Sequence, residues 1–180
     1  MNTITTDRLT LRSFSIDDLK SLVDIADDRR IADGMISIPH PYTIQYAEQW
    51  IKRAEKNMKA DISYYFAITL NEDNRLIGSI ELRAIEMEHL QAETSFWIGS
   101  DWQGNGYATE AANAMIKFGF ITLGLNRIYA HHMLRNRSSE NVLKKIGMTC
   151  EGTMRQRVIK WGIFEDVGFY AIIKQDLQSA

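Results

Sequence analysis

The segment AETSFWIGSDWQGNGYATEA, residues 92–111, constrains the fold more than any other part of the chain. Its first part reads as an apolar strand, and from Tyr107 onward apolar residues recur at helical spacing. Gly104 and Gly106 stand at the crossing, where glycine permits a positive φ and a close approach of a ligand to the backbone. The first N–H groups of a helix have no acceptor within it and attract anions. The segment therefore predicts a strand followed by a helix whose N-terminus binds a phosphate group.

Two other interpretations of the glycines can be compared with this one. No Gly-Lys-Ser/Thr follows them, so the segment is not a Walker A loop, and the third glycine of the dinucleotide fingerprint is missing. The remaining alternative is that Gly104 and Gly106 only make a tight strand-to-helix turn. Local spacing does not decide between a turn and a pyrophosphate site.

Periodicity along the rest of the chain predicts a mixed α/β fold with the order β-α-α-β-β-β-α-β-α-β-β. A strand over 8–14 leads into a helix that Ser15 and Asp18 open as a capping box. The loop 34–43 contains both prolines, and Thr43 begins a second helix. Three antiparallel strands follow from residue 63, and the chain closes with a hairpin at Trp161–Gly162. No linker or repeat divides residues 1–180, so we expect one domain.

Composition excludes several function classes. The net charge is −2 and the pI is near 6.1, which gives no overall attraction for nucleic acid or an anionic membrane. No apolar run approaches the roughly 20 residues of a membrane span, and no signal-peptide pattern precedes Thr10. The single cysteine, Cys150, excludes an intramolecular disulfide, and we expect it to be buried and inert. These features predict a protein of the reducing cytoplasm.

The two adjacent histidines do not predict a metal site. His131 and His132 lie on a predicted strand, where neighbouring side chains project to opposite faces, and no further ligand cluster accompanies them. We therefore expect no metal. Either histidine could act as a base if it lined a cleft, and the alternative is a hydrogen-bonded structural histidine.

Three blocks of the sequence resemble the GNAT family of N-acetyltransferases. Gln103, Gly106 and Ala108 fill the family's Q/R-x-x-G-x-G/A loop, and Ile98 takes the apolar place five positions before it. Together with NRIYAHHMLRNRSSENVLKKIGM and EGTMRQ, the loop resembles the branch that acetylates ribosomal-protein N-termini (the Rim type) and its small-molecule relatives. The resemblance covers most of residues 7–175 and implies a mainly antiparallel sheet with helices on both faces.

The resemblance implies how acetyl-CoA is held. Backbone groups of Phe96, Trp97 and Ile98 would bond the pantetheine arm in an opening between two splayed strands, and Asn136 would also contact it. The amides that would hold the pyrophosphate are those of Gln103, Gly104, Asn105, Gly106, Tyr107 and Ala108. No metal takes part, and a homodimer is expected by analogy with relatives.

The chemistry of acetyl transfer requires a base. An amine with a pKa near 10.4 is neutral in roughly one molecule of 2,500 at pH 7, so a proton acceptor is needed. The family often keeps a glutamate at the position of Glu93, which is therefore our candidate base. The alternative for Glu93 is a solvated carboxylate at the end of a strand.

The departing CoA thiolate requires a proton donor. The tyrosine that many relatives use for this is Leu143 here, so Ser139 becomes the candidate donor, with a hydrogen bond at the helix N-terminus as its alternative. Val158 replaces a glutamate of the Rim-type enzymes.

The expected function is transfer of an acetyl group from acetyl-CoA directly to a primary amine, through a ternary complex. The amine would belong to a protein N-terminus or a small molecule, and the loop 34–43 and the hairpin 155–164 would wall its site. There are two alternatives. One is a different acyl donor on the same site, and the other is a CoA-binding sensor or interaction domain without turnover.

Overall fold

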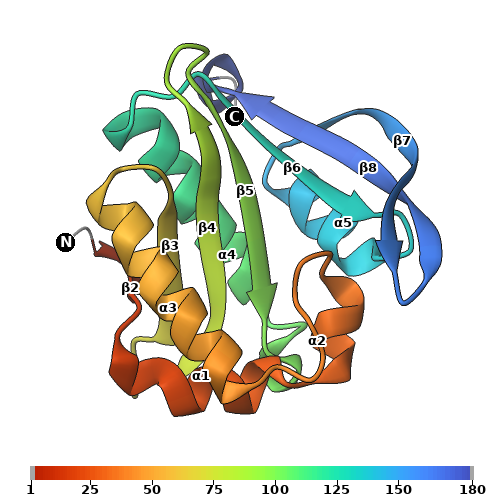
Figure 1. Cartoon of the computed structure of the whole chain (residues 1–180). Coiled ribbons are helices and arrows are strands. Elements are labelled where there is room, and N and C mark those ends of the chain that lie inside the picture. The colour runs from red at the N-terminus through yellow and green to blue at the C-terminus, as the bar shows by residue number, and fades with distance from the viewer. Residues whose placement is uncertain (1–2, 179–180) are drawn as a thin grey trace.

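Within residues 3–178, which the computed structural model describes, eight strands form one sheet in the order β1-β2-β3-β4-β5-β6-β8-β7 (Figure 1). Every neighbouring pair is antiparallel except β5 and β6. The strands are β1 (Ile4–Thr5), β2 (Leu9–Ser13), β3 (Tyr64–Leu70), β4 (Leu76–Glu86), β5 (Gln91–Ile98), β6 (Arg127–Met133), β7 (Thr149–Lys160) and β8 (Ile163–Ile173).

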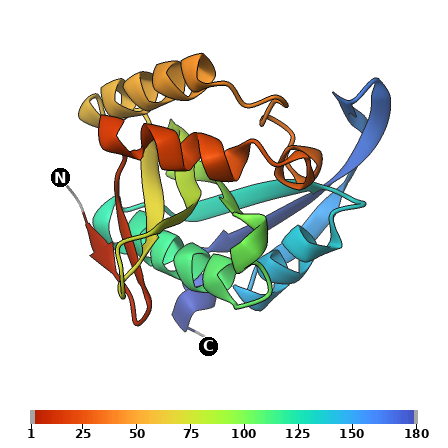
Figure 2. The ribbon, with the colours of Figure 1, turned by 90° about the horizontal axis from the view of Figure 1, so that it is seen from below.

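Helices cover both faces of this sheet. Figure 2 shows α1 and α3 on one face and α4 and α5 on the other. The helices are α1 (Leu19–Ala26), α2 (Arg29–Gly34), α3 (Ile44–Lys59), α4 (Tyr107–Lys117) and α5 (Arg137–Lys145). Short helical turns span Ile16–Asp18, Ser100–Trp102, Phe118–Thr122 and Lys174–Gln178. The predicted order is confirmed, with the short elements β1 and α2 as additions.

Local sequence signals explain where the first helices begin. The backbone N–H of Ser15 donates to Asp18 Oδ2 at 2.9 Å, which completes the predicted capping box. Thr43 caps α3, because its hydroxyl accepts from the backbone N–H of Tyr46 at 3.2 Å. The unexpected helix α2 is capped in the same way by the side chain of Asp28.

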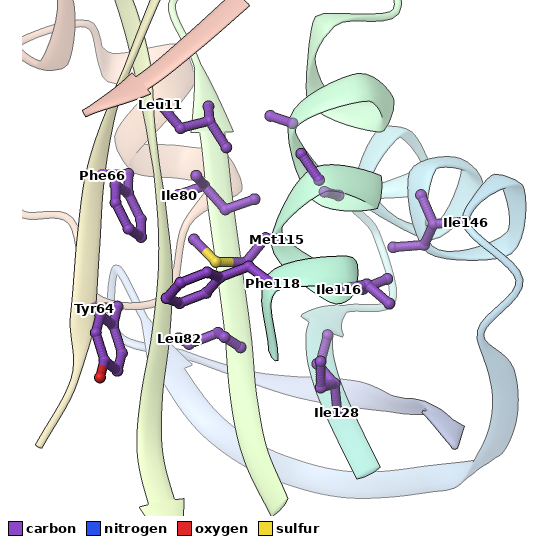
Figure 3. Close-up of a cluster of buried hydrophobic side chains, with 14 of the residues drawn as sticks. Leu11, Tyr64, Phe66, Ile80, Leu82, Met115, Ile116, Phe118, Ile128 and Ile146 are labelled. Atoms are coloured by element: carbon purple, nitrogen blue, oxygen red, sulfur yellow. The ribbon is translucent and has the colours of Figure 1, made fainter. Parts of the chain in front are cut away.

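Two hydrophobic cores share the sheet. Figure 3 shows the core on the α4 face, where buried side chains of the strands meet those of α4 and the following turn: Leu11, Phe66, Ile80 and Leu82 against Met115, Ile116 and Phe118. The core on the other face joins Leu22, Ala26, Ala47 and Ile51 to Ala67 and Leu76. Burying a large apolar side chain contributes about 1.5–3 kcal/mol, so packing on both faces holds α4 and α3 against the strands.

The expectation for Cys150 is wrong. Its side chain is exposed rather than buried. Cys150 lies on β7, which is the last strand of the sheet order and pairs only with β8. An edge strand beyond the helical cover leaves side chains in solvent even where the sequence is partly apolar. Among residues 3–178 no helix is long and apolar enough to cross a lipid bilayer.

Candidate functional site

The strands β5 and β6 separate after a short parallel contact. They pair only over Gln91–Glu93 and Arg127–Tyr129, and beyond these residues they diverge (Figure 1). From Thr94 to Ile98, β5 has a partner only on its β4 side. The predicted opening between two strands is therefore present, with Glu93 at its closed end.

Two of the three predicted pantetheine contacts present their backbone to this opening. The N–H of Gly99 donates to Ile77 O on the β4 side, at 2.8 Å. Main-chain groups alternate in direction along an antiparallel strand, so those of Trp97 also face β4. Those of Phe96 and Ile98 face the opening. Trp97 can contribute to the site through its side chain rather than its backbone.

The loop after β5 has the conformation that its glycines predict. Gly104 and Gly106 have φ angles of +81° and +82°. Within residues 3–178 the amides of Gly104, Asn105, Gly106, Tyr107 and Ala108 donate to no other group of the chain. They precede or begin α4, where the helix dipole favours negative charge. This is the arrangement expected for a site that holds an anion.

Side chains from outside the loop hold it in place. The guanidinium of Arg8 donates to the backbone O of Asn105 at 3.0 Å, forms an ion pair with Glu110 at 2.7 Å, and lies over the ring of Tyr107. Gln103 is tied to β5, because its side-chain amide donates to Ile98 O at 2.8 Å. The loop is thus fixed before any ligand arrives, which lowers the entropic cost of binding.

A groove of about 410 Å³ begins at this loop and ends at the opening between the strands. We call it the loop groove. Its lining includes ten of the predicted site residues: Phe96, Trp97, Ile98, Gln103, Gly104, Gly106, Tyr107, Ala108, Asn136 and Ser139. Asn105 is not in the lining, since its side chain donates to the carbonyls of Trp102 and Gln103.

Asn136 and Ser139 lie at the start of α5, across the groove from the glycine loop. Asn136 Oδ1 accepts from the backbone N–H of Ser139 at 3.1 Å, and its Nδ2 donates to Gly34 O at 2.9 Å. Asn136 therefore caps α5 and ties it to α2. The hydroxyl of Ser139 makes no hydrogen bond within residues 3–178, so it is available to a ligand.

A small cavity of about 40 Å³ lies inside the opening between β5 and β6. We call it the throat. It shares Phe96 and Ser139 with the loop groove, and its remaining walls include His131 and Leu143. His131 lines a cleft, which is the condition under which the sequence allowed it to act as a base.

Glu93 lies behind the throat rather than in its lining. The residue is 8% exposed, and its Oε1 is 2.7 Å from Arg83 Nη2 and 3.2 Å from His131 Nδ1. Arg83 Nη1 is also 3.0 Å from Glu81 Oε1. Glu93 is thus a paired, buried carboxylate and not the solvated strand end that was its alternative.

A third cavity, of about 150 Å³, lies on the α3 face of the sheet. We call it the aromatic pocket. The carboxylate of Glu81 lines it and lies beside Arg83. Five aromatic residues also line it: Tyr42, Tyr46, Trp50, Tyr65 and Trp97. Burial raises the pKa of Glu81 above its ordinary value, although Arg83 opposes the shift. Met35 lines all three cavities, so groove, throat and pocket lie next to one another.

The sequence predicted part of this pocket. Met35, Ser37, Ile38 and Tyr42 of the predicted wall 34–43 line it, whereas the hairpin 155–164 contributes no lining residue. The hairpin supports the loop instead, because Lys160 Nζ donates to Ile38 O at 2.9 Å. The sequence did not predict that residues of α3 and β3 line the pocket. The alternation of Ser79, Glu81 and Arg83 along β4 was the available signal that polar groups share one face.

Among residues 3–178 no cluster of three or more metal-binding side chains occurs. His131 and His132 project to opposite sides as predicted. His131 contacts Glu93, while His132 is buried against Tyr170 and its Nδ1 lies 2.9 Å from Met133 O.

Comparison with known proteins identifies the family. The family model of the acetyltransferase (GNAT) domain matches residues 8–149. The chain is 31% identical to the uncharacterized N-acetyltransferase YnaD of Bacillus subtilis over 96% of this chain and 98% of the relative. Its fold matches the ribosomal L7/L12 α-N-protein acetyltransferase RimL in complex with coenzyme A, with a TM-score of 0.89 and 18% identity over 96% and 98% of the two chains. It also matches spermidine N-acetyltransferase from Vibrio cholerae in complex with CoA and spermine, with a TM-score of 0.84 and 24% identity over 96% and 99%. The chain belongs to the GNAT family of N-acetyltransferases, whose acetyl donor is acetyl-CoA.

Proposed function

We propose that this enzyme transfers the acetyl group directly to a primary amine while acetyl-CoA and the amine are bound together. The observation that carries the proposal is a set of three neighbouring cavities that share lining residues: a groove that starts at unpaired amides, a throat between two strands, and a pocket on the opposite face. Acetyl-CoA would enter from the groove and the amine from the pocket. The two substrates would meet at the throat.

The glycine loop supports the placement of the donor. Five free amides and the N-terminus of α4 suit a pyrophosphate. The main-chain groups of Phe96 and the N–H of Ile98, which face the opening, suit the amides of pantetheine. Acetyl-CoA would then complete the missing strand pairing beside β5. The predicted contacts of Gln103, Asn105 and Asn136 remain part of this proposal.

Direct transfer is favoured because no cysteine lines the three cavities within residues 3–178. Cys150 lies on the exposed edge strand instead. An acyl-enzyme formed on cysteine would need a thiolate near the throat. Ser139 reaches both the groove and the throat, so its hydroxyl is proposed as the proton donor to the CoA thiolate.

The aromatic pocket limits the acceptor. A volume of about 150 Å³ accommodates one ring or one side chain rather than a folded surface. The charged residues in its lining are Glu81, Arg53 and Arg83, so the carboxylate of Glu81 is the one acidic group there that an amine can pair with. The proposed acceptor is a compact amine or the first residue of a peptide.

Thermal unfolding with acetyl-CoA tests the donor site, with ATP and NAD as controls. Ligand at 100 times its Kd stabilises the folded state by about 2.7 kcal/mol, which raises the midpoint by several degrees for a chain of this size. A shift with acetyl-CoA alone is expected. No shift at millimolar acetyl-CoA would contradict the donor site.

Thiol release with a panel of amines tests the reaction. Spermidine and peptides with a free N-terminal serine or alanine are suitable first probes. Intersecting initial-rate lines would support a ternary complex, and parallel lines would indicate an acyl-enzyme. Binding without thiol release from any amine would favour the alternative of a CoA-binding sensor domain.

A homodimer is also part of the proposal. The end of the β7–β8 hairpin exposes large apolar side chains that a second copy could cover: Ile159, Trp161, Ile163 and Phe164. Light scattering should give twice the chain mass, and a mass that stays at one chain across concentrations would contradict the dimer.

A further inference from the structure

His131 has a position in the site that the proposed function does not yet use. It lies on β6 beyond the parallel contact with β5, and it lines the throat together with Phe96, Ser139 and its neighbour His132. Ser139 also lines the loop groove, and Arg83 and Ser95 of the throat also line the aromatic pocket. His131 is therefore placed where the acetyl group and the amine would meet.

The two ring nitrogens of His131 have different surroundings. Nδ1 lies 3.2 Å from Glu93 Oε1, whereas Nε2 has no hydrogen-bond partner within residues 3–178. A carboxylate beside one ring nitrogen favours the tautomer with the proton on that nitrogen. The lone pair is then on Nε2, the nitrogen that remains open to a ligand.

Glu93 is placed to orient this ring and not to meet substrate itself. Its Oε1 is shared between His131 and Arg83, and the residue does not line the groove, the throat or the pocket. The pairing of Arg83 with Glu93 in turn keeps the carboxylate in one place. A base whose second nitrogen is held by a carboxylate is the general arrangement of an activated imidazole.

We propose that His131 is the base that takes the proton from the acceptor amine through Nε2, and that Glu93 is a positioning residue that acts through His131. This proposal rests on the proposed function. An ammonium at the throat would first give one proton to Nε2, which passes it to solvent. The amine nitrogen would then attack the acetyl carbonyl carbon, a C–N bond would form, and the C–S bond would break. The second proton would leave the nitrogen and reach the CoA thiolate through the hydroxyl of Ser139.

The charges around His131 are compatible with this role. Burial is the main cause that lowers the pKa of His131 below its ordinary value, while the carboxylate of Glu93 opposes this shift. Arg83 on β4, Arg157 on β7 and His132 on its own strand lower the pKa further. The imidazole is therefore neutral at pH 7 and able to accept a proton.

The central experiment compares His131→Asn with the unmodified enzyme over a range of pH. Spermidine and an alanine-initiated peptide serve as acceptors in the thiol-release assay. At pH 7 we expect kcat/KM of the variant to fall by about 10²–10⁴-fold. As the pH rises toward the pKa of the amine, the difference in kcat/KM between the variant and the unmodified enzyme should shrink by up to tenfold per pH unit. The reason is that the variant depends on amine that has already lost its proton. His89→Asn, at an exposed turn, is the matched control and should keep full activity.

Two outcomes would overturn the role of His131. An unchanged kcat/KM at pH 7 would show that the ring is not the base. A loss of the same size at every pH would show that the substitution only disturbs the structure. The midpoint shift with acetyl-CoA should match that of the unmodified enzyme, which confirms that the variant still folds and binds the donor.

Glu93→Gln tests the positioning role. The acid limb of the pH profile should move to lower pH, because the carboxylate that raises the pKa of His131 is gone. Glu93→Asp, which keeps a carboxylate, should have more activity than Glu93→Gln, and the acid limb of its pH profile should lie closer to that of the unmodified enzyme. An acid limb that stays in place in Glu93→Gln would contradict the coupling between Glu93 and His131.

Imidazole ¹⁵N NMR separates this proposal from the proposed function. In the free protein His131 should be neutral at pH 7 with its proton on Nδ1. A protonated ring, or a proton on Nε2, would overturn the proposal even if the enzyme acetylates amines. Conversely, the expected tautomer without turnover of any amine would count against the proposed function alone.

Discussion

At the scale of single residues, Gly104 and Gly124 have nearly the same backbone but different surroundings. Their φ angles are +81° and +71°, and a Cβ on either would meet no atom of the protein within 4 Å. Gly104 lines the loop groove, whereas Gly124 lies on a turn that borders none of the three cavities. Substitutions at these two positions therefore distinguish the effect of backbone strain from the effect of contact with a ligand.

We predict that Gly104→Ala and Gly124→Ala lower the free energy of unfolding equally, by about 1–2 kcal/mol, since both place a Cβ in the left-handed region. Only Gly104→Ala should weaken acetyl-CoA binding, by tenfold or more, because its Cβ occupies space beside the pyrophosphate. Calorimetric titration and denaturant unfolding measure the two effects. Equal affinities in the two variants would mean that the loop is only a turn.

Asp18 is a second residue whose role is local. It is 7% exposed and accepts from both Nη atoms of Arg12 and from the backbone of Ser15. Burial acts to raise the pKa of Asp18, but the hydrogen bonds from Arg12 and Ser15 outweigh it and hold the pKa below its ordinary value. The charged form therefore stabilises the fold above the unfolded pKa, and this contribution disappears as pH falls through the lower, folded pKa.

Asp18→Asn should accordingly reduce the free energy of unfolding by about 2 kcal/mol at pH 7. The difference from the unmodified protein should shrink as pH falls below 4. Urea unfolding at pH 7 and under acid conditions measures this. A difference that does not depend on pH would mean that shape, not charge, accounts for the role of Asp18.

At the scale of elements, Asn136 connects the elements that border the open end between β5 and β6. Asn136 joins β6 to α5 by capping the helix, and it joins α5 to α2 through Gly34. These links span one side of the loop groove. The geometry of the opening thus depends on one side chain that serves two elements.

Asn136→Ala should lose the cap and the bond to Gly34, at a cost of about 1–3 kcal/mol. Asn136→Asp keeps the cap acceptor and loses only the donor, so its loss should be smaller. Both variants should bind acetyl-CoA several-fold more weakly, because α2 is released from α5. If Asn136→Asp binds as tightly as the unmodified enzyme, the bond to Gly34 does not shape the groove.

At the scale of the whole molecule, the two cores pack on opposite faces of the same strands. Ile51 belongs to the α3 face and Met115 to the α4 face, and both are almost fully buried. Loss of packing on either face is transmitted through the shared sheet. We therefore expect one cooperative unit, as the undivided sequence predicts.

Ile51→Ala and Met115→Ala should each lower the free energy of unfolding by about 2–5 kcal/mol, in a single transition. The double variant should show the sum within about 0.5 kcal/mol, since the two sites share no partner. Fluorescence and circular dichroism should report the same midpoint. Two separate transitions would contradict a single domain.

Much of the fold could be predicted from sequence because its signals are local. The turn at Gly104 and Gly106, the caps at Ser15 and Thr43, and the order of elements depend on residues within a few positions of one another. Glu93 and Ser139 could be named from family resemblance, but their surroundings could not. The exposure of Cys150 was missed for the same reason, since it follows from the place of β7 at the sheet edge.

The sequence by itself determined most of the elements, the glycine loop and the unpaired amides of that loop. Only the tertiary structure decided that Glu93 meets Arg83 and His131, residues of the two neighbouring strands. It also assembled the aromatic pocket from helices and strands far apart in the chain. The physical reason is that local backbone preferences depend on near neighbours, whereas strand order and register determine which distant side chains share a cavity.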